Sequence, residues 1–128
     1  MTTNTAGLLT ISEVADRTGL SAHTLRYYER EGLMLREVGR ASSSHRRYSD
    51  QDVTWVVFLS RLRSTAMPIA RIREYVTLAR KGDATSGARR ELLLLHRMRV
   101  VEQLEEMQRS LAAVDVKIAM YEEKVENA

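Results

Sequence analysis

Residues 21–33 concentrate arginine, tyrosine, histidine and threonine side chains, which can donate hydrogen bonds to the phosphate oxygens and base edges of nucleic acids. On a helix capped by the Ser21 hydroxyl, Leu25 and Tyr28 lie three residues apart and share an apolar face. The side chains that point elsewhere are His23, Thr24, Arg26, Tyr27 and Arg30. This pattern predicts either a helix that lies in a groove of a double helix or an ordinary surface helix with a solvated face.

A second amphipathic segment precedes this helix and can support it. Thr10 and Glu13 form a capping-box pattern, an apolar stripe follows, and Gly19 is placed to end the helix in a left-handed C-cap. Two short helices joined by a tight turn that contains glycine are typical of a helix-turn-helix, whose second helix enters the major groove of DNA. A plain helical hairpin is the alternative interpretation of the same segments.

Residues 36–48 contain few core residues but many arginines and turn formers. Val38 and Tyr48 flank a small loop with serine and glycine, which predicts a two-stranded hairpin, or wing, with short strands. Arginines in such a loop are either solvated or bound to phosphates, and their place beside a helix-turn-helix favours phosphate contacts. The arginines that we assign to these contacts are Arg40, Arg46 and Arg47.

Two further helices are predicted between the wing and Gly82. Ser49 and Asp52 form a second capping pattern that begins the third helix. Pro68 suits the first turn of a fourth helix, because its missing N–H would have no partner within the helix there. Both segments carry apolar stripes, so we expect residues 8–82 to form one DNA-binding domain with its own core.

Residues 83–87 are predicted to be a polar linker that leads into a dimerisation helix over residues 88–128. Along that helix, apolar residues alternate spacings of four and three, the heptad pattern of a coiled-coil seam. The seam residues are Val100, Leu104, Met107, Leu111, Val114, Ile118, Tyr121 and Val125. From Ala88 to Val125 the helix would be ~57 Å long at about 1.5 Å per residue, too long for so small a domain to cover its seam. We therefore predict a homodimer, with a helix packed back on its own domain as the alternative.

The composition excludes several classes of function. The chain has 128 residues, of which 44% are hydrophobic, enough for one domain with a modest core, and it contains no cysteine. The lack of cysteine excludes disulfides, thiolate metal sites and cysteine nucleophiles. The three histidines have no spacing typical of a metal site or of a nucleophile and its base. We therefore expect no enzymatic activity, no metal and no cofactor.

The distribution of charge and apolar residues suggests location and partner. No apolar run reaches the ~18 residues of a membrane span, and residues 1–7 lack a secretory pattern, which predicts a cytoplasmic protein with a disordered N-terminal tail. Residues 61–73 hold four arginines and no acid, whereas residues 102–128 hold seven acidic residues against three basic ones. This asymmetry predicts that only the N-terminal part of the chain faces a polyanion, which we take to be double-stranded DNA.

The sequence TLRYYE of residues 24–29 is followed by Gly32-Leu33, then by Arg46-x-Tyr48, and then by Arg61-Leu62-Arg63 in the third predicted helix. In this order the motifs resemble the MerR family of bacterial transcription regulators, over residues 8 to about 80. The resemblance implies a mainly α-helical fold, in which a winged helix-turn-helix is followed by a long C-terminal helix that forms an antiparallel coiled-coil dimer. It also implies a homodimer that binds a palindromic promoter site. Such regulators bend and untwist the DNA so that RNA polymerase can read both promoter elements.

The resemblance also implies roles for individual residues. Arg26 and Tyr27 match the family's contacts to bases and phosphates, and Arg17 matches a frequent phosphate contact. Arg46 and Tyr48 match the Arg-x-Tyr of the wing. His23 and Thr24 lie on the same exposed side of the recognition helix. Where the family usually has Gly-Tyr before the wing arginine, this chain has Ser44-His45, which implies a different turn.

Other functions are compatible with the same fold. One alternative is an architectural or excisionase-like DNA-binding protein that acts without an effector. Another is a ligand sensor with a pocket between Trp55, Phe58 and Tyr75, although core filling is the more common role of such residues. Metal-sensing and redox-sensing members of the family use cysteine, so the resemblance leaves a small organic ligand, a protein partner or no effector for this chain. The sequence does not distinguish an activator from a repressor.

Overall fold

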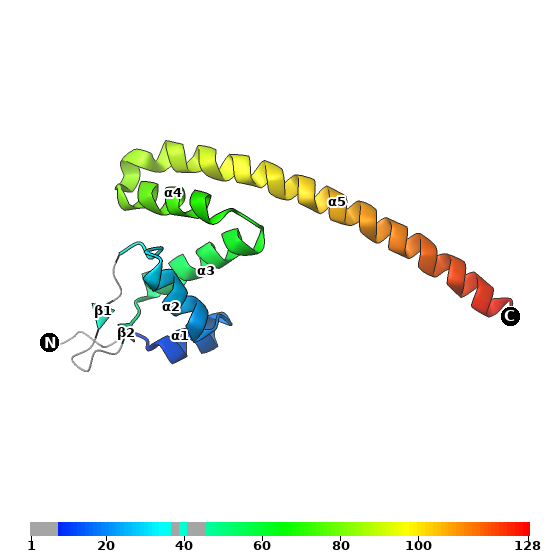
Figure 1. Cartoon of the computed structure of the whole chain (residues 1–128), viewed down its shortest axis with the longest axis horizontal. Coiled ribbons are helices and arrows are strands. Elements are labelled where there is room, and N and C mark those ends of the chain that lie inside the picture. The colour runs from blue at the N-terminus through cyan, green and yellow to red at the C-terminus, as the bar shows by residue number, and fades with distance from the viewer. Residues whose placement is uncertain (1–7, 37–38, 41–45) are drawn as a thin grey trace. The chain divides into compact units, whose positions relative to one another are not determined.

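The computed structural model of this chain describes residues 8–36, 39–40 and 46–128. The predictions for the N-terminal tail, for Val38 and for Ser44-His45 therefore lie outside the described residues. The chain forms two compact units, residues 1–89 and residues 90–128. The fold is mainly α-helical, as predicted, with a single short two-stranded pairing among the described residues (Figure 1).

The elements follow one another in a simple order. The first unit contains α1 (Ile11–Thr18), α2 (Ala22–Arg30), β1 (Gly39–Arg40), β2 (Arg46–Arg47), α3 (Asp50–Ser64), α4 (Ile69–Arg80) and the 3-10 helix η1 (Gly82–Thr85). The last helix, α5 (Ser86–Glu126), begins in the first unit and makes up nearly all of the second. The predicted order of two helices, a wing, two helices and a long helix is confirmed.

The ends of α1 and the start of α2 are set by local side-chain chemistry. The Thr10 hydroxyl accepts a hydrogen bond from the Glu13 amide at 3.1 Å, and the Glu13 carboxylate accepts one from the Thr10 amide at 2.8 Å, so the predicted capping box is present. Gly19 ends α1 with a φ of 78°, a left-handed conformation that glycine adopts without strain. The Ser21 hydroxyl then caps α2 by accepting a bond from the Thr24 amide at 3.0 Å.

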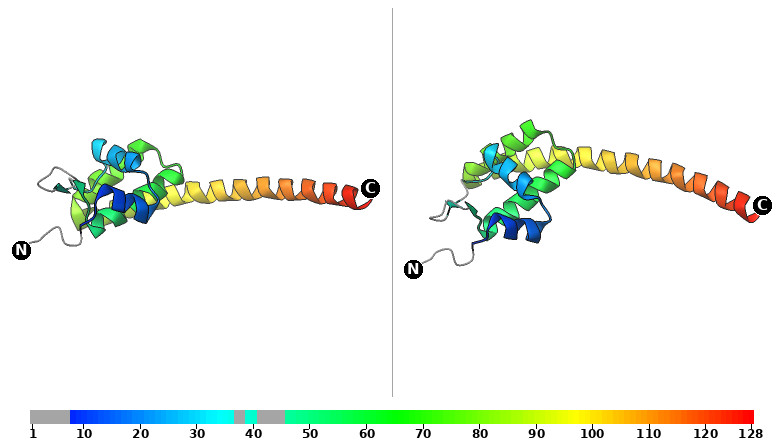
Figure 2. Two further views of the ribbon diagram at one scale, coloured as in Figure 1. Left: turned by 90° about the horizontal axis from the view of Figure 1, so that it is seen from below. Right: turned by 60° about the horizontal axis from the view of Figure 1, so that its bottom comes forward.

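The core of the first unit lies where α1 packs against α2 and α3, and where α3 packs against α4. Figure 2 shows this helix cluster from two further directions. The fully buried side chains are Tyr48, Leu25, Leu33, Leu59, Ile72, Val14, Val56 and Val76. Each of the helices α1 to α4 contributes to this set, so α2 packs on an apolar core that the whole unit forms.

The wing is an antiparallel pairing of β1 with β2, in which Gly39 lies opposite Arg47 and Arg40 lies opposite Arg46. An isolated bridge extends it: the Leu9 and Tyr48 backbones exchange two hydrogen bonds, of 2.8 and 2.7 Å. The base of the wing is therefore tied to the residues just before α1. The predicted two-stranded wing is present, with strands as short as expected.

Residues 83–87 differ from the predicted linker. They are ordered as the end of η1 and the first residues of α5. The Thr85 hydroxyl donates to the Leu78 carbonyl at 2.5 Å, and the Arg89 guanidinium donates to the Gly82 carbonyl at 2.9 Å. The Leu78 carbonyl also accepts from the Lys81 amide at 3.0 Å, and the Gly82 carbonyl of η1 also accepts from the Thr85 hydroxyl at 2.9 Å. The polar residues of this segment therefore act in a helix-to-helix turn.

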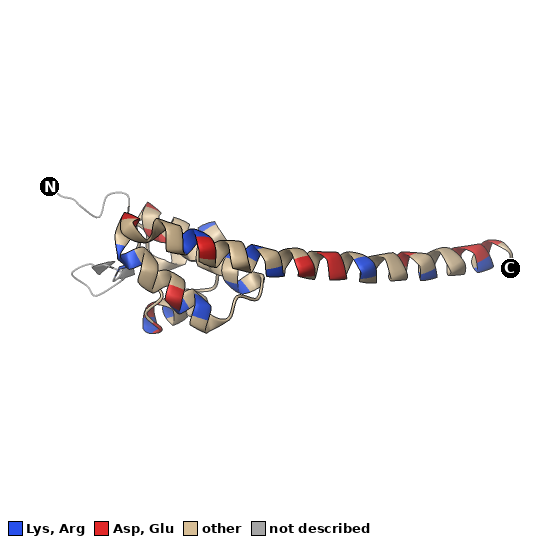
Figure 3. Cartoon of the chain, turned by 90° about the horizontal axis from the view of Figure 1, so that it is seen from above, with Lys and Arg blue, Asp and Glu red and all other residues tan. Residues whose placement is uncertain are grey.

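The second unit is a single uninterrupted helix, the part of α5 that follows Arg89. Charged residues recur along its whole length (Figure 3). Large apolar side chains are nevertheless exposed there, among them Leu104, Met107, Leu111, Val114, Ile118, Tyr121 and Val125. No helix within the described ranges is long and apolar enough to cross a membrane.

Candidate nucleic-acid interface

The two faces of α2 are arranged as the spacing predicted. Leu25 and Tyr28 are 0% and 3% exposed, and the Tyr28 hydroxyl lies 3.2 Å from the Ser60 hydroxyl of α3. On the other side, His23 and Arg26 are exposed, and Thr24 and Tyr27 are half-buried. The helix therefore keeps its hydrogen-bond donors on a surface that a groove of DNA can reach.

Tyr27 is held between two cations. The guanidinium carbon of Arg30 lies 5.7 Å from the centre of the Tyr27 ring, and that of Arg63 lies 5.6 Å from it. Cations attract the face of an aromatic ring at such distances, and the two arginines concentrate positive charge around the Tyr27 ring. Arg63 comes from the last turn of α3, so this cluster joins the recognition helix to a second element.

Arg63 was not among the predicted DNA-binding residues. The Arg-Leu-Arg motif at the end of α3 showed that a cation was present, but spacing within α3 could not show which other helix lies beside it. Arg63 shares an open hollow of about 600 Å³ with Tyr27. The other residues that line the hollow are Leu20, His23, Thr24, Tyr28, Ser60 and Ser64. Hydroxyl, imidazole and guanidinium donors on one concave surface are suited to a phosphate or a base edge.

Arg17 lies at the end of α1 with an exposed side chain. Its guanidinium is 3.4 Å from the Asp50 carboxylate, and the two side chains are 57% and 83% exposed. An ion pair this exposed contributes little stability. Arg17 can therefore exchange this carboxylate for a phosphate oxygen at a small cost in free energy. The phosphate contact of Arg17 stays a prediction.

The structure corrects the assignment of Tyr48 as a DNA contact. The side chain is 0% exposed, and its hydroxyl donates to the Glu29 carboxylate of α2. Its backbone pairs with Leu9 at the base of the wing. Tyr48 thus packs between the wing and the recognition helix, where it has no surface left for a phosphate.

We expect Tyr48→Phe to lower the free energy of unfolding by roughly 1–3 kcal/mol, because the partly buried Glu29 carboxylate loses a donor while the aromatic packing is kept. Urea titration followed by circular dichroism measures the change. The matched control is a double-mutant cycle with Glu29→Gln, in which we expect the two effects to be non-additive. Additive effects would show that the two side chains do not stabilise the fold through each other.

The wing arginines occupy the paired strands. Arg46 and Arg47 form β2, and Arg40 belongs to β1, but the side chains of Arg40 and Arg46 lie outside the described residues. The half-buried Arg47 lies near the start of α1. The pKa of the Glu13 carboxyl is lowered, mainly because the carboxylate accepts hydrogen bonds from Thr10, with a smaller contribution from the positive charge of Arg47.

Two family descriptions match the chain. "MerR HTH family regulatory protein" matches residues 9–78, and "MerR, DNA binding" matches residues 53–116. The first match alone covers more than half of the chain and contains α1, α2, the wing and α3. The chain belongs to the MerR family. The family membership predicted from the TLRYYE motif is therefore confirmed.

This MerR-family chain is similar to the HTH-type transcriptional regulator AdhR of Bacillus subtilis (strain 168), with 40% identity over 94 residues. That alignment covers 73% of this chain and 66% of AdhR, slightly less than two thirds. An uncharacterized HTH-type transcriptional regulator of Haemophilus influenzae is 34% identical over 113 residues, which cover 88% of this chain and 83% of the relative.

The fold is also shared with solved MerR regulators. HiNmlR, a MerR family regulator lacking the sensor domain and crystallised bound to promoter DNA, superimposes with a TM-score of 0.84 and 33% identity. The superposition covers 90% of this chain and 86% of HiNmlR. A MerR family protein from Listeria monocytogenes gives a TM-score of 0.81 and 35% identity. The long C-terminal helix therefore accompanies the helix-turn-helix in related regulators.

The aromatic residues considered for an effector pocket pack against one another. The Trp55 and Tyr75 rings are stacked with centroids 5.9 Å apart, and the Phe58 and Tyr75 centroids are 5.6 Å apart. The Trp55 indole N–H donates to the Leu33 carbonyl at 2.8 Å. These contacts give the three rings a structural role between α3 and α4, and binding of an effector there stays a prediction.

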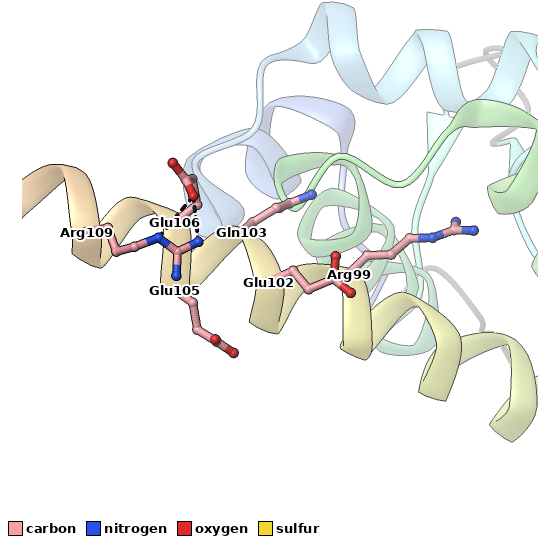
Figure 4. A pocket seen from close by; sticks show the side chains of 6 residues that line it. All are labelled: Arg99, Glu102, Gln103, Glu105, Glu106 and Arg109. Carbon is pink, nitrogen blue, oxygen red and sulfur yellow. Dashed lines mark hydrogen bonds and ion pairs between the residues drawn. The ribbon is translucent and has the colours of Figure 1, made fainter.

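Within the described ranges, neither a group of metal ligands nor the hollow on α5 forms an effector site. No group of three or more histidine, aspartate or glutamate residues in the part of the chain that the structure describes could hold a metal ion. A hollow on α5 is lined by Arg99, Glu102, Gln103, Glu105, Glu106 and Arg109 (Figure 4). All six side chains belong to one helix and the Glu106 carboxylate pairs with Arg109 at 2.6 Å, so the hollow is the surface of a helix and lacks opposing walls.

Proposed function

We propose that this MerR-family regulator binds a palindromic promoter site as a homodimer, with α2 of each subunit in the major groove. The observation that carries the proposal is the cluster in which Tyr27 lies between Arg30 and Arg63, beside the exposed His23 and Arg26. A concave, cationic surface on the second helix of a helix-turn-helix suits a phosphate backbone and the base edges next to it. The promoter DNA bound to HiNmlR supports the same role here.

The exposed seam of α5 supports the dimer. Leu104, Leu111 and Ile118 are each about half-exposed in the single chain and lie on one side of the helix. Burial of such side chains against a second copy would contribute about 25 cal/mol for each Å² of apolar surface removed from water. The heptad spacing favours a partner helix that pairs along the full seam. A second copy of this chain provides one.

The proposed dimer acts through DNA shape. Two recognition helices held at a fixed separation bind both half-sites only if the DNA between them adopts the matching bend and twist. Such a deformation costs of order 1–6 kcal/mol, which the contacts must recover. By deforming a promoter, the dimer would change how RNA polymerase reads it. We propose that this regulation takes place in the cytoplasm and involves binding without catalysis, and an effector would act by biasing two states of the dimer.

Footprinting on the DNA upstream of the gene that encodes this chain tests the proposal. We expect protection of a two-fold symmetric site at a stoichiometry of two chains per DNA duplex. Protection inside a recombination site, without any promoter, would favour the architectural alternative. A comparison with and without cell extract would then show whether an effector is needed. The absence of any sequence preference would contradict the proposal.

The contribution of the wing to DNA binding can be tested separately. We expect Arg46→Ala to weaken DNA binding and to lower the slope of log affinity against log salt concentration by about 1, because one phosphate contact is lost. Fluorescence anisotropy at several salt concentrations measures both quantities. Arg109→Ala removes the same charge from α5 and is expected to leave the slope unchanged. A wild-type slope in Arg46→Ala would remove the wing arginine from the DNA interface.

A further inference from the structure

The segment that leaves the recognition helix is held by two arginines of α4. Residues 31–35 lead from α2 toward the wing, and the amides of Glu31, Gly32 and Leu33 bond the carbonyls of the last turn of α2. The Arg73 guanidinium donates to the Glu31 carbonyl at 2.6 Å and to the Glu31 carboxylate at 2.7 Å. The Arg80 guanidinium donates to the carbonyls of Gly32 at 2.8 Å, Met34 at 2.5 Å and Leu35 at 3.2 Å.

These bonds suit the chemistry of both partners. The carbonyl oxygens of the segment after α2 carry partial negative charge, and their hydrogen bonds are strengthened by a charged donor. Guanidinium has five N–H donors in a fixed planar arrangement, so a single side chain can hold several carbonyls and fix their relative positions. Leu33 and Met34 are buried in the core, so the bonds from Arg80 fix a segment that is also anchored by packing.

The same arginines would otherwise be assigned to DNA. Arg73 belongs to the run of four arginines without an acid at residues 61–73, and both Arg73 and Arg80 are exposed. These bonds orient both guanidinium groups toward the 31–35 segment and leave only their remaining N–H groups for a phosphate. Within the same run, only Arg63 lies against a ring of the recognition helix. The arginines of the basic run therefore differ in role: Arg63 lies against the recognition helix, Arg73 holds the segment that follows it, and Arg71 pairs with Glu74.

Arg80 also stands next to the turn that begins α5. It is the last residue of α4, and the following Gly82 carbonyl accepts a bond from Arg89 at 2.9 Å. Thr85 binds the Leu78 carbonyl one turn earlier in α4. Within the first unit, residues 32–35 and η1 are thus both bonded to the last turn of α4, through the Arg80 guanidinium and the Leu78 carbonyl.

We propose that Arg73 and Arg80 are positioning residues for DNA recognition: they do not contact DNA, but set the direction in which α2 and the wing leave the core. This inference rests on the proposed DNA-binding function. It predicts that their loss weakens binding to the operator while the number of phosphate contacts stays the same. Binding to unrelated DNA depends on phosphate contacts and not on how α2 is aligned with particular base pairs. We therefore expect it to be nearly unchanged.

The test compares Arg80→Ala, Arg80→Lys and Arg73→Ala with the wild-type chain by fluorescence anisotropy. Operator DNA and unrelated DNA are each titrated at several salt concentrations, well below the unfolding midpoint of every variant. We expect Arg80→Ala to lower operator affinity roughly tenfold or more, with the wild-type salt slope. The operator affinity of Arg80→Lys is expected to lie between those of the wild-type chain and Arg80→Ala, because one ammonium group can hold only some of the three carbonyls.

Arg71→Ala is the matched control. Arg71 lies on the same helix, but its guanidinium pairs with the Glu74 carboxylate at 2.7 Å, so the variant removes the same charge without touching residues 31–35. We expect its operator affinity to stay close to wild type.

A salt slope lowered by about 1 in Arg80→Ala, with equal losses on both DNAs, would show that Arg80 contacts a phosphate and would overturn the inference. Wild-type operator affinity in both Arg80→Ala and Arg73→Ala would overturn it as well. If Arg80→Ala does not fold, Arg80→Lys and Arg73→Ala decide the question by the same two measurements. A wild-type chain that prefers no operator would instead contradict the proposed function itself.

Discussion

Leu111→Glu is expected to convert the proposed dimer to a monomer of 14.6 kDa. Leu111 lies in the middle of the seam and is 58% exposed in the single chain, and a second copy would bury it in the proposed dimer. A carboxylate at this position would be buried without a partner in the dimer, at a cost of about 3–5 kcal/mol. Sedimentation equilibrium at micromolar concentration measures the mass. Operator affinity should fall with it, because a monomer reads one half-site.

Val116→Glu is the matched control for this change. Val116 is 63% exposed and lies two residues from both Val114 and Ile118, so it faces away from the seam on a helix with about 3.6 residues per turn. The same carboxylate is therefore solvated in the dimer, and the variant should sediment as the wild-type chain does. A dimer that persists in Leu111→Glu would contradict the seam assignment.

Arg26→Ala is expected to weaken operator binding by about 1–3 kcal/mol, or five- to 150-fold, if its guanidinium contacts a base edge. Arg26 is exposed on the same side of α2 as His23, and Leu25 next to it is fully buried, so the substitution removes surface chemistry without opening the core. Anisotropy titrations on the footprinted site, and on versions with single base changes, measure affinity and specificity. The sedimentation mass should stay that of the dimer.

Two further variants sharpen this test. Tyr27→Ala removes the ring that Arg30 and Arg63 approach, so we expect a loss of similar size, caused partly by the release of two guanidinium groups. Arg109→Ala removes one positive charge from α5 and should leave operator affinity nearly unchanged. Wild-type affinity in both Arg26→Ala and Tyr27→Ala would remove these residues from the DNA interface.

Local sequence patterns were sufficient for the elements themselves. The Thr10–Glu13 capping box and Gly19 predicted where α1 begins and ends, and the spacing of Leu25 and Tyr28 predicted the buried face of α2. These features depend on residues within one or two helical turns, whose relative positions follow from helix geometry. The motif TLRYYE was specific enough to predict the family.

Contacts between separate elements could not be predicted in this way. The sequence placed Tyr48 in a basic wing, but its position against Glu29 arises because the wing closes onto the recognition helix. Likewise, the bonds of Arg73 and Arg80 to residues 31–35 join positions more than 40 residues apart in the chain. Spacing along one helix indicates which side a residue occupies but not which element lies opposite it. The sequence therefore predicted the buried and exposed faces of α2, whereas the bonds from α4 to residues 31–35 and the contact of Tyr48 with Glu29 were decided by the tertiary structure.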